Sequence, residues 1–144
     1  MNNKVLASLC CLLVSSTSWA GAMESCPQAS QIQSINGIYT ALTASGQDEW
    51  LGVIGHGKAG DVQSFESGLF YPAANFSGTQ GTLAYCEYKT IDGVALNMRY
   101  RANEPEVRVS LARLENWQEG KSAFGQVFHE CTNPAPGACA FTAD

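Results

Sequence analysis

Four cysteines are the residues of this sequence with the clearest chemistry. Cys26, Cys86, Cys131 and Cys139 allow three disulfide pairings. Cys131 and Cys139 flank the segment TNPAPGA, whose Pro and Gly residues favour a turn, so we expect them to close a short loop. Cys26 would then pair with Cys86. A zinc site usually has closely spaced pairs such as Cys-x2-Cys, and the sequence has none, so we predict disulfides and no metal.

A glycine-rich segment is the second candidate for chemistry. Gly55, His56, Gly57 and Lys58 begin a Gly-x-Gly-x-x-Gly pattern that ends at Gly60. Nucleotide-binding loops of this kind need a helix after the loop, because the helix N-terminus holds the phosphate. Here a strand pattern follows, and an alanine stands after the lysine where a P-loop has Ser or Thr. We therefore predict a β–β loop that contacts a ligand, at most an anion held by backbone N–H groups and Lys58, and no cofactor.

A catalytic alternative rests on a few carboxylates. Asp48, Glu49 or Asp61 beside His56 would suit a hydrolase of cell-wall or extracellular polymers. No Gly-x-Ser-x-Gly elbow or Ser-His-Asp order accompanies them. The other histidine, His129, lies in a predicted strand and is expected to be a residue of a sheet face. We predict no catalytic residue, and the test of the alternative is whether these groups converge in one pocket.

Aromatic residues are numerous for a chain of this length, with 3 Trp, 5 Tyr and 6 Phe. Aromatic rings exposed on a sheet stack on sugars or anchor protein interfaces, whereas most rings fill the core. We expect Trp50 and Trp117 to be exposed and to contact a ligand.

The elements that must position these residues are strands. Val94, Leu96, Met98 and Tyr100 alternate with polar or small residues, which is typical of a half-buried antiparallel strand. Residues 91–93 predict a hairpin loop that joins this strand to the one before it. The predicted strands are 37–43, 49–54, 62–71, 82–89, 94–100, 107–111, 124–131 and 138–142. Helical turns are expected only at 27–33, with Ser25 as cap and Pro27 in the first turn, and at 111–119. The sequence thus predicts an all-β fold, a small antiparallel β-sandwich or open barrel of about eight strands.

The N-terminal residues have the pattern of a secretory signal peptide. Lys4 precedes the apolar run VLASLCCLLV, and Ser18-Trp19-Ala20 offers a cleavage site. We predict a cleaved signal peptide at 1–20, with an alternative cut after Ala22, and one β domain at 21–144. Cys10 and Cys11 lack the small preceding residue of a lipoprotein signal, so no membrane anchor is expected. Export to the periplasm or the medium follows, where disulfides persist.

The charge of the chain limits its partners. The sequence of 144 residues has 13 acidic and 8 basic residues and a formal net charge of −5. Nucleic acids and anionic membranes require a basic face, so we expect neither as a partner. We expect a monomer.

Five short motifs resemble a family of small secreted proteins of unknown function from Gram-negative bacteria. They are Cys26-Pro27, Trp50-Leu51-Gly52, Phe70-Tyr71-Pro72, the Gly-Thr-Leu-x-x-Cys-x-Tyr segment 81–88, and residues 139–141. The resemblance covers nearly the whole mature chain, and it implies no activity.

A fainter resemblance is to bacterial C-type lysozyme inhibitors, which are small periplasmic β-barrels. Tyr85-Cys86, the Asp92-Gly93 turn and the strand 94–100 are similar to their core hairpin. The inhibitory Ser-Gly-x-x-Tyr loop of that family does not follow this hairpin.

Taken together, these patterns predict an exported binding protein without catalytic activity. Its partner would be a host protein, an envelope component or a glycan, contacted by loops on a rigid scaffold. One alternative is an inhibitor of a secreted hydrolase, which would carry one protruding loop. The other alternative is an extracellular hydrolase.

Overall fold

The computed structural model describes residues 21–55, 60–74 and 78–143. The predicted signal peptide lies outside these residues. The strands are β1 (Met23–Ser25), β2 (Gln33–Ile35), β3 (Ile38–Leu42), β4 (Glu49–Val53), β5 (Val62–Pro72), β6 (Gln80–Thr90), β7 (Ala95–Tyr100), β8 (Val109–Leu111), β9 (Gln118–Lys121), β10 (Val127–Cys131) and β11 (Ala140–Ala143). Two 3-10 turns, η1 (Ala29–Gln31) and η2 (Leu114–Asn116), are the only helical elements within the described ranges. The predicted all-β class is confirmed.

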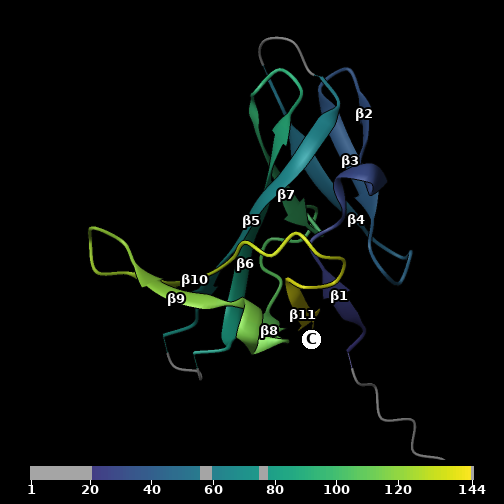
Figure 1. Cartoon of the computed structure of the whole chain (residues 1–144). Helices are drawn as coiled ribbons and strands as arrows, with labels where there is room; N and C mark the ends of the chain where they lie inside the picture. Colours follow the sequence, from purple (N-terminus) through teal and green to yellow (C-terminus); the bar gives the residue numbers. More distant parts are fainter. Residues whose placement is uncertain (1–20, 56–59, 75–77, 144) are drawn as a thin grey trace, which may run out of the picture.

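The two longest strands form the spine of the sheet (Figure 1). β5 pairs with β6 along its whole length, and the other edge of β6 pairs with β7 at one end and with β8 at the other. Two groups of strands branch from this spine. The first wing is β7, β4, β3 and β2, and the second wing is β8, β11 and β1. Eight strands thus follow one continuous path from β1 to β2, and every pairing is antiparallel.

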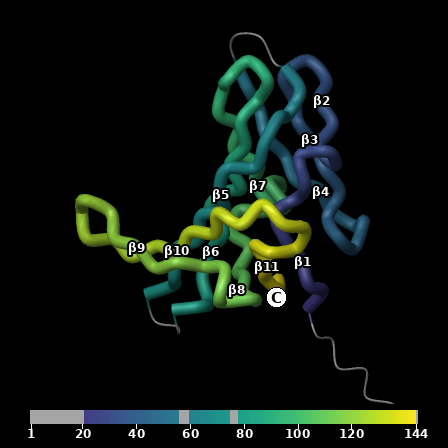
Figure 2. Tube along the Cα trace, in the orientation of Figure 1, coloured from purple at the N-terminus to yellow at the C-terminus, as the bar shows by residue number. Residues whose placement is uncertain are grey.

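The two wings curl toward each other and form a half-barrel, as the trace in Figure 2 shows. Aromatic rings from both wings meet inside it. Trp50 of β4 lies 5.2 Å from Tyr100 of β7 and 6.0 Å from Phe141 of β11, measured between ring centroids. Trp50 and Phe141 are fully buried. The structure therefore has the open form of the predicted barrel, and side-chain packing across the core joins its two wings.

The alternating pattern correctly located the central hairpin. β6 and β7 cover the predicted strands 82–89 and 94–100, and their inward residues include Tyr88, Leu96 and Met98. Gly93 in the connecting loop has φ +78°, a conformation that glycine adopts without steric cost. The sequence pattern and the turn residue agree here, so the register is well specified.

Both predicted disulfides are confirmed. Cys26 is bonded to Cys86 and ties the N-terminal segment to β6, while Cys131 is bonded to Cys139 and closes the loop after β10. The phenol of Tyr88 donates a hydrogen bond to the carbonyl of Pro27 beside the first bridge, and burial raises the pKa of this phenol. The segment before η1 is thus fixed to the spine by a covalent bond and a buried hydrogen bond.

Both predicted helical segments are confirmed as single 3-10 turns, η1 within 27–33 and η2 within 111–119. The predicted cap of the first turn was wrong: η1 begins at Ala29, and its cap is Gln28 rather than Ser25, because the Gln28 and Gln31 side chains bond each other's backbone N–H groups. The predicted start of one strand was wrong as well, since residues 122–126 form a turn and β10 starts at Val127 rather than at Phe124.

Candidate functional site

Trp50 does not offer a contact surface. Its exposed fraction is 0 %, because it lies on the inner face of β4 against Tyr100 and Phe141. The expectation that this ring is exposed was wrong, and the reason is that the wing curls over it. It is a core residue that holds the two wings together.

Trp117 is buried as well, with an exposed fraction of 7 %. Its indole N–H donates to the carbonyl oxygens of Ala112, at 3.2 Å, and Ala140, at 3.3 Å. Its ring packs edge-on against Phe70 of the spine. The expected exposure was wrong here too, and the residue is instead an anchor directly before β9.

The glycine-rich loop lies only partly within the described residues. Gly55 is exposed, and no atom outside its chain neighbours comes within 4 Å of the place where its Cβ would be. His56, Gly57 and Lys58 lie outside the described residues. Their predicted ligand contacts stay predictions.

The carboxylates of the hydrolase alternative are not gathered in one place. Asp48 precedes β4 and pairs with Arg101 at 3.3 Å. Asp61 directly precedes β5, and Ser34 Oγ donates to it. Asp48 and Glu49 line one cavity, whereas Asp61 lines none of the described cavities, so the three carboxylates do not converge.

The feature that stands out from the body of the molecule is the hairpin of β9 and β10, which we call the β9–β10 arm (Figure 1). Among the residues that the structure describes, β9 pairs with β10 alone, and β10 pairs with β5 at its last three residues alone, His129, Glu130 and Cys131. The distal half of the hairpin therefore has no other strand beside it. An isolated two-stranded hairpin is marginally stable in water, so the arm needs support within itself and at its base.

The tip of the arm is an ordered turn. Ser122 N donates to Gln126 O, Gly125 N donates to Ser122 O, and Gln126 N donates to Ser122 Oγ. Gly125 has φ +79°, which closes the turn. This turn presents Phe124 with an exposed fraction of 99 %. A large apolar ring is thus held outward by a backbone that is fixed by hydrogen bonds.

An aromatic ring stiffens the shaft of the arm. A Cβ at Gly120 of β9 would lie 2.5 Å from the ring of Phe128 on β10, so the ring of Phe128 lies across the glycine. Packing of an aromatic ring over a glycine in a neighbouring strand replaces the side-chain contact that glycine lacks.

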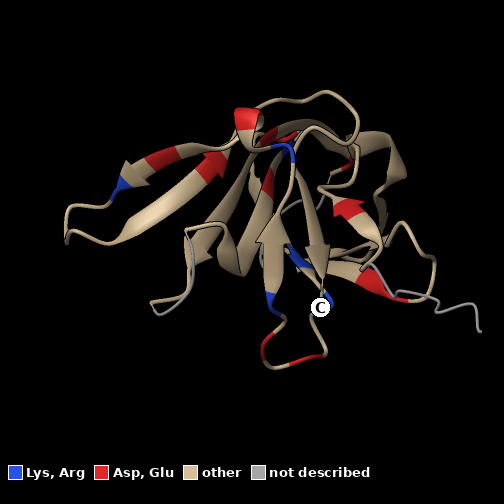
Figure 3. Ribbon diagram, turned by 90° about the horizontal axis from the view of Figure 1, so that it is seen from below, with Lys and Arg blue, Asp and Glu red and all other residues tan. Residues whose placement is uncertain are grey.

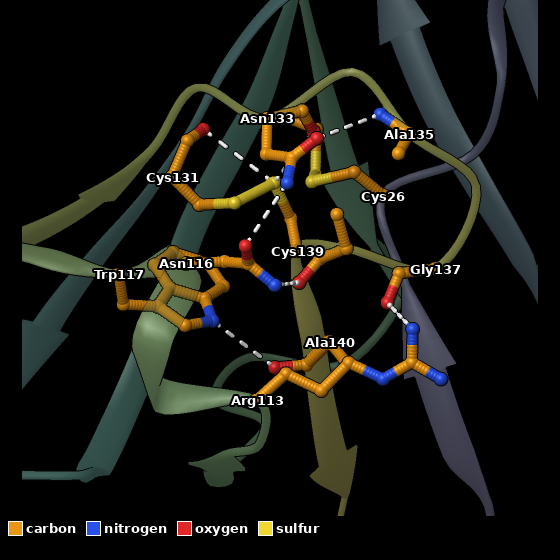
Figure 4. Close-up of a disulfide and its surroundings, with 12 residues drawn as sticks. Cys26, Arg113, Asn116, Trp117, Cys131, Asn133, Ala135, Gly137, Cys139 and Ala140 are labelled. Atoms are coloured by element: carbon orange, nitrogen blue, oxygen red, sulfur yellow. Dashed lines mark hydrogen bonds between the residues drawn. A yellow bond between two sulfur atoms is a disulfide. The ribbon is translucent and has the colours of Figure 1, made fainter.

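The base of the arm is fastened at both of its strands (Figure 4). Trp117 is buried just before β9, and the Cys131–Cys139 disulfide holds the last residue of β10. Asn116 donates to Ala138 O and accepts from Asn133, which ties η2 to the loop that this disulfide closes. The arm therefore projects from a rigid base.

Arg113 adds a further bond at this base and has a strained backbone. Its guanidinium donates to Gly137 O at 2.8 Å. Its φ is +51°, in the left-handed region, which costs about 1 kcal/mol or more for a residue that is not glycine. The hydrogen bond to Gly137 O helps to hold the backbone of Arg113 in this left-handed conformation.

The charges around the arm have a small acidic excess, because three glutamates outnumber Lys121 and Arg113 of the base. Glu115 at its base and Glu119 on β9 are exposed, Glu130 on β10 is half-buried, and Lys121 is the basic residue of the two strands. Figure 3 shows these acidic segments along the arm and at its foot. A cleft with basic residues on its rim would complement this arrangement.

Sequence reasoning missed this site because its residues lack a conspicuous motif. Phe124 fell inside an apolar-looking stretch that resembles a strand. The usable signal was Gly125, since a glycine after an aromatic residue and between two candidate strands favours a turn.

Within the described residues, no helix is long and apolar enough to cross a membrane. The same residues contain no group of three or more His, Cys, Asp or Glu side chains that would hold a metal ion.

Of the three comparisons with known proteins, the comparison with protein families gives a match. A family model described as "Protein of unknown function (DUF3757)" matches residues 21–142. Neither the curated proteins nor the solved structures contain a significant match. The resemblance to C-type lysozyme inhibitors therefore has no support from these comparisons. Because the matched residues make up most of the sequence, the chain belongs to the DUF3757 family of proteins of unknown function.

Proposed function

We propose that this protein is an exported, non-catalytic binding protein that docks onto a partner protein through the β9–β10 arm. The observation that carries the proposal is Phe124, a phenylalanine with an exposed fraction of 99 % at the tip of an ordered, projecting hairpin. A phenylalanine ring that is exposed to water does not stabilise the fold. Burying a phenylalanine side chain in a partner contributes about 1.5–3 kcal/mol, and anchors of this kind dominate protein interfaces.

The chemistry of the arm favours a protein over a glycan or a membrane. Phe124 is a single ring at the end of a narrow turn, and it lacks the hydroxyl of tyrosine and the indole N–H of tryptophan, which form hydrogen bonds with sugars. The acidic residues Glu115 and Glu119 beside the arm would be repelled by an anionic membrane. The partner that fits is a protein with an apolar pocket and basic residues on its rim.

Export is part of the proposal. The two disulfides are consistent with an oxidising compartment. A Cβ at Gly21 would contact the carbonyl oxygen of Ala143, so Gly21 lies against the last residue of β11 as part of the domain. We therefore expect signal peptidase to cut before Gly21, in the periplasm or on the way to the medium. Intact mass measurement of the exported protein tests this, and a mature chain that begins at Met23 would contradict it.

A narrower form of the same function is inhibition of a secreted hydrolase. The observation that favours it is the shape of the arm, which is the kind of single protruding element that enters an active-site cleft. A panel of secreted hydrolases assayed with and without the oxidised protein tests this form. We expect that inhibition of any member depends on Phe124.

Site-specific photo-crosslinking tests the docking proposal. A photoreactive phenylalanine analogue at position 124 is compared with the same analogue at position 114, because Leu114 is an exposed apolar residue, with an exposed fraction of 51 %, that lies at the base rather than at the tip. We expect position 124 to crosslink one protein in envelope or host extracts and position 114 to crosslink it weakly.

The variant Phe124→Ala separates binding from folding. Because the ring is almost wholly exposed, its loss should change the free energy of unfolding by less than about 0.5 kcal/mol, while binding of the crosslinked protein falls at least about tenfold. Equal crosslinking at both positions, unchanged affinity of Phe124→Ala, or association with lipid vesicles instead of a protein would overturn the proposal.

A further inference from the structure

A second site lies at the seam of the half-barrel, away from the β9–β10 arm. A cavity of about 620 Å³ opens there between the β1–η1 segment and the strands β3 and β4. We call it the seam cavity. The lining residues that bear on its chemistry are Glu24, Ser25, Gln33, Thr40, Ala44 and Glu49. Its volume is that of a small-ligand site, and barrel mouths are places where such sites form.

Glu24 is the unusual residue of this cavity. Its exposed fraction is 7 %, and its carboxylate accepts N–H groups from Ser25, at 3.1 Å, and from Ala44, at 2.7 Å. A carboxylate has about four acceptor positions, so these two bonds leave part of its capacity free. Buried carboxylates are normally paired with a cation.

No cation of the described residues is paired with Glu24. The guanidinium of Arg101 pairs with Asp48 and Glu104 instead. The lining of the seam cavity contains neither Lys nor Arg. Burial raises the pKa of Glu24, and the N–H groups of Ala44, Ser25 and Trp50 only partly offset that effect. The carboxylate is therefore buried beside a cavity without a counter-charge.

The remaining lining residues suit a polar ligand. Glu49 adds a second carboxylate, and Ser25, Gln33 and Thr40 add hydroxyl and amide groups. A metal ion is a poor fit, because these two carboxylates do not form part of any metal-binding group among the residues that the structure describes. An ammonium group carries the complementary charge and several N–H donors, and it can approach a carboxylate without a full coordination shell.

We propose that the seam cavity binds the ammonium group of a small organic amine, with Glu24 and Glu49 as its anionic partners. The amine is carried either by an amino sugar or by an aliphatic amine. This site is independent of the arm, so either proposal can fail without the other.

NMR titration of the oxidised, signal-free protein tests this proposal. The probes are glucosamine and putrescine, with N-acetylglucosamine and 1,4-butanediol as their neutral counterparts. We expect the amines to shift the backbone amide signals of Ser25 and Ala44 with saturation, and the neutral compounds to leave them unchanged. Glucosamine binding more tightly than putrescine would identify an amino sugar as the source of the ammonium group, and the reverse order would identify an aliphatic amine.

Two variants show whether the carboxylates carry the binding. Hydrogen bonds between charged groups are stronger than those between neutral groups, so Glu24→Gln and Glu49→Gln should each weaken amine binding by about tenfold or more. Glu49→Gln remains informative if Glu24→Gln disturbs the fold, since Glu49 is exposed. Glu115→Gln is the matched control, because it removes the same charge at an exposed residue that does not line the cavity.

Several results would overturn the proposal. Absence of saturable shifts at Ser25 and Ala44 with both amines would do so, as would equal binding of the neutral counterparts. An equal loss of affinity in Glu115→Gln would show a general charge effect rather than a site.

Discussion

The side chain of Glu24 joins the two wings of the half-barrel, because its carboxylate accepts the backbone N–H of Ala44 at 2.7 Å. Glu24 lies in β1 of the second wing, and Ala44 follows β3 of the first wing. These wings share no backbone ladder at this point, so a side chain supplies the bond across the seam. Trp50 interacts with the same carboxylate and lowers its pKa, but its indole N–H has no partner of normal hydrogen-bond geometry.

The stability of the protein should depend on the ionisation of Glu24. Burial raises its pKa in the folded state above the ordinary value of 4.5, and the neighbouring N–H groups of Ala44, Ser25 and Trp50 oppose this. The folded state therefore favours the protonated form, so the stabilisation is fully present below pH 4.5 and is lost as pH rises through the folded-state pKa.

Urea unfolding of wild type and Glu24→Gln between pH 4 and pH 8 measures this dependence. Glutamine does not ionise, so we expect the stability of wild type relative to the variant to decrease as pH rises. Glu115→Gln, a change at an exposed position, should leave the pH profile unchanged. A relative stability that increases with pH would show that the hydrogen bonds dominate and that the pKa of Glu24 is lowered.

The two disulfides should contribute unequally to stability. The Cys26–Cys86 bridge spans 60 residues and the Cys131–Cys139 bridge spans 8. In the chain-entropy model, loops of these lengths correspond to about 4 and about 2.5 kcal/mol. We expect Cys26→Ala/Cys86→Ala to lower the free energy of unfolding more than Cys131→Ala/Cys139→Ala, as measured by urea unfolding. Peptide mapping without reductant must show the other bridge intact, and the opposite order would reject the entropic explanation.

The central hairpin and the cystine pairing were predictable because local and long-range signals agree there. Alternation from Val94 to Tyr100, a glycine in the turn, and the short spacing of Cys131 and Cys139 each point to one structure. The wings and the arm were harder. Burial of Trp50 depends on the curl that brings Phe141 over it, and this contact between distant strands leaves no local pattern in the sequence.

The arm was missed for a different physical reason. β9 has the sequence Gln-Glu-Gly-Lys, which has low β-propensity and no apolar residue. It is a strand because Trp117 fixes its start and the ring of Phe128 packs across Gly120. Propensity alone favours a turn or a short helix in this segment, and the tertiary contacts of Trp117 and Phe128 outweigh it.

Gly81 should be the glycine of the spine that tolerates substitution least. A Cβ there would collide with the carbonyl oxygen of Tyr71 and would lie 2.9 Å from Ala73 N. Both neighbours belong to the backbone, which cannot rotate away. We expect Gly81→Ala to lower the free energy of unfolding by about 3 kcal/mol.

Gly55→Ala is the matched control for this substitution. No described residue other than its chain neighbours has an atom within 4 Å of its Cβ position, so the change should stay within about 0.5 kcal/mol of wild type. Thermal or urea unfolding measures both variants. An equal loss of unfolding free energy in both variants would show that replacing any glycine destabilises the protein, and that the close approach of β5 and β6 is not the cause.

Trp117 should hold the β9–β10 arm in place without contacting a partner. Trp117→Phe keeps an aromatic ring against Phe70 but removes the donor to Ala112 O and Ala140 O. The carbonyl of Ala140 retains the N–H of Ala112 as a partner, so we expect the free energy of unfolding to fall by only about 1 kcal/mol.

This destabilisation should be local, because the missing hydrogen bonds lie at the foot of the arm. Hydrogen exchange should therefore quicken at amides of β9 and β10 and stay unchanged in β6 and β7. Phe124→Ala, which alters the tip alone, should leave exchange in both regions as in wild type. Uniformly faster exchange throughout the Trp117→Phe protein would mean that the indole stabilises the whole fold, and that the arm is held by its disulfide and strand pairing instead.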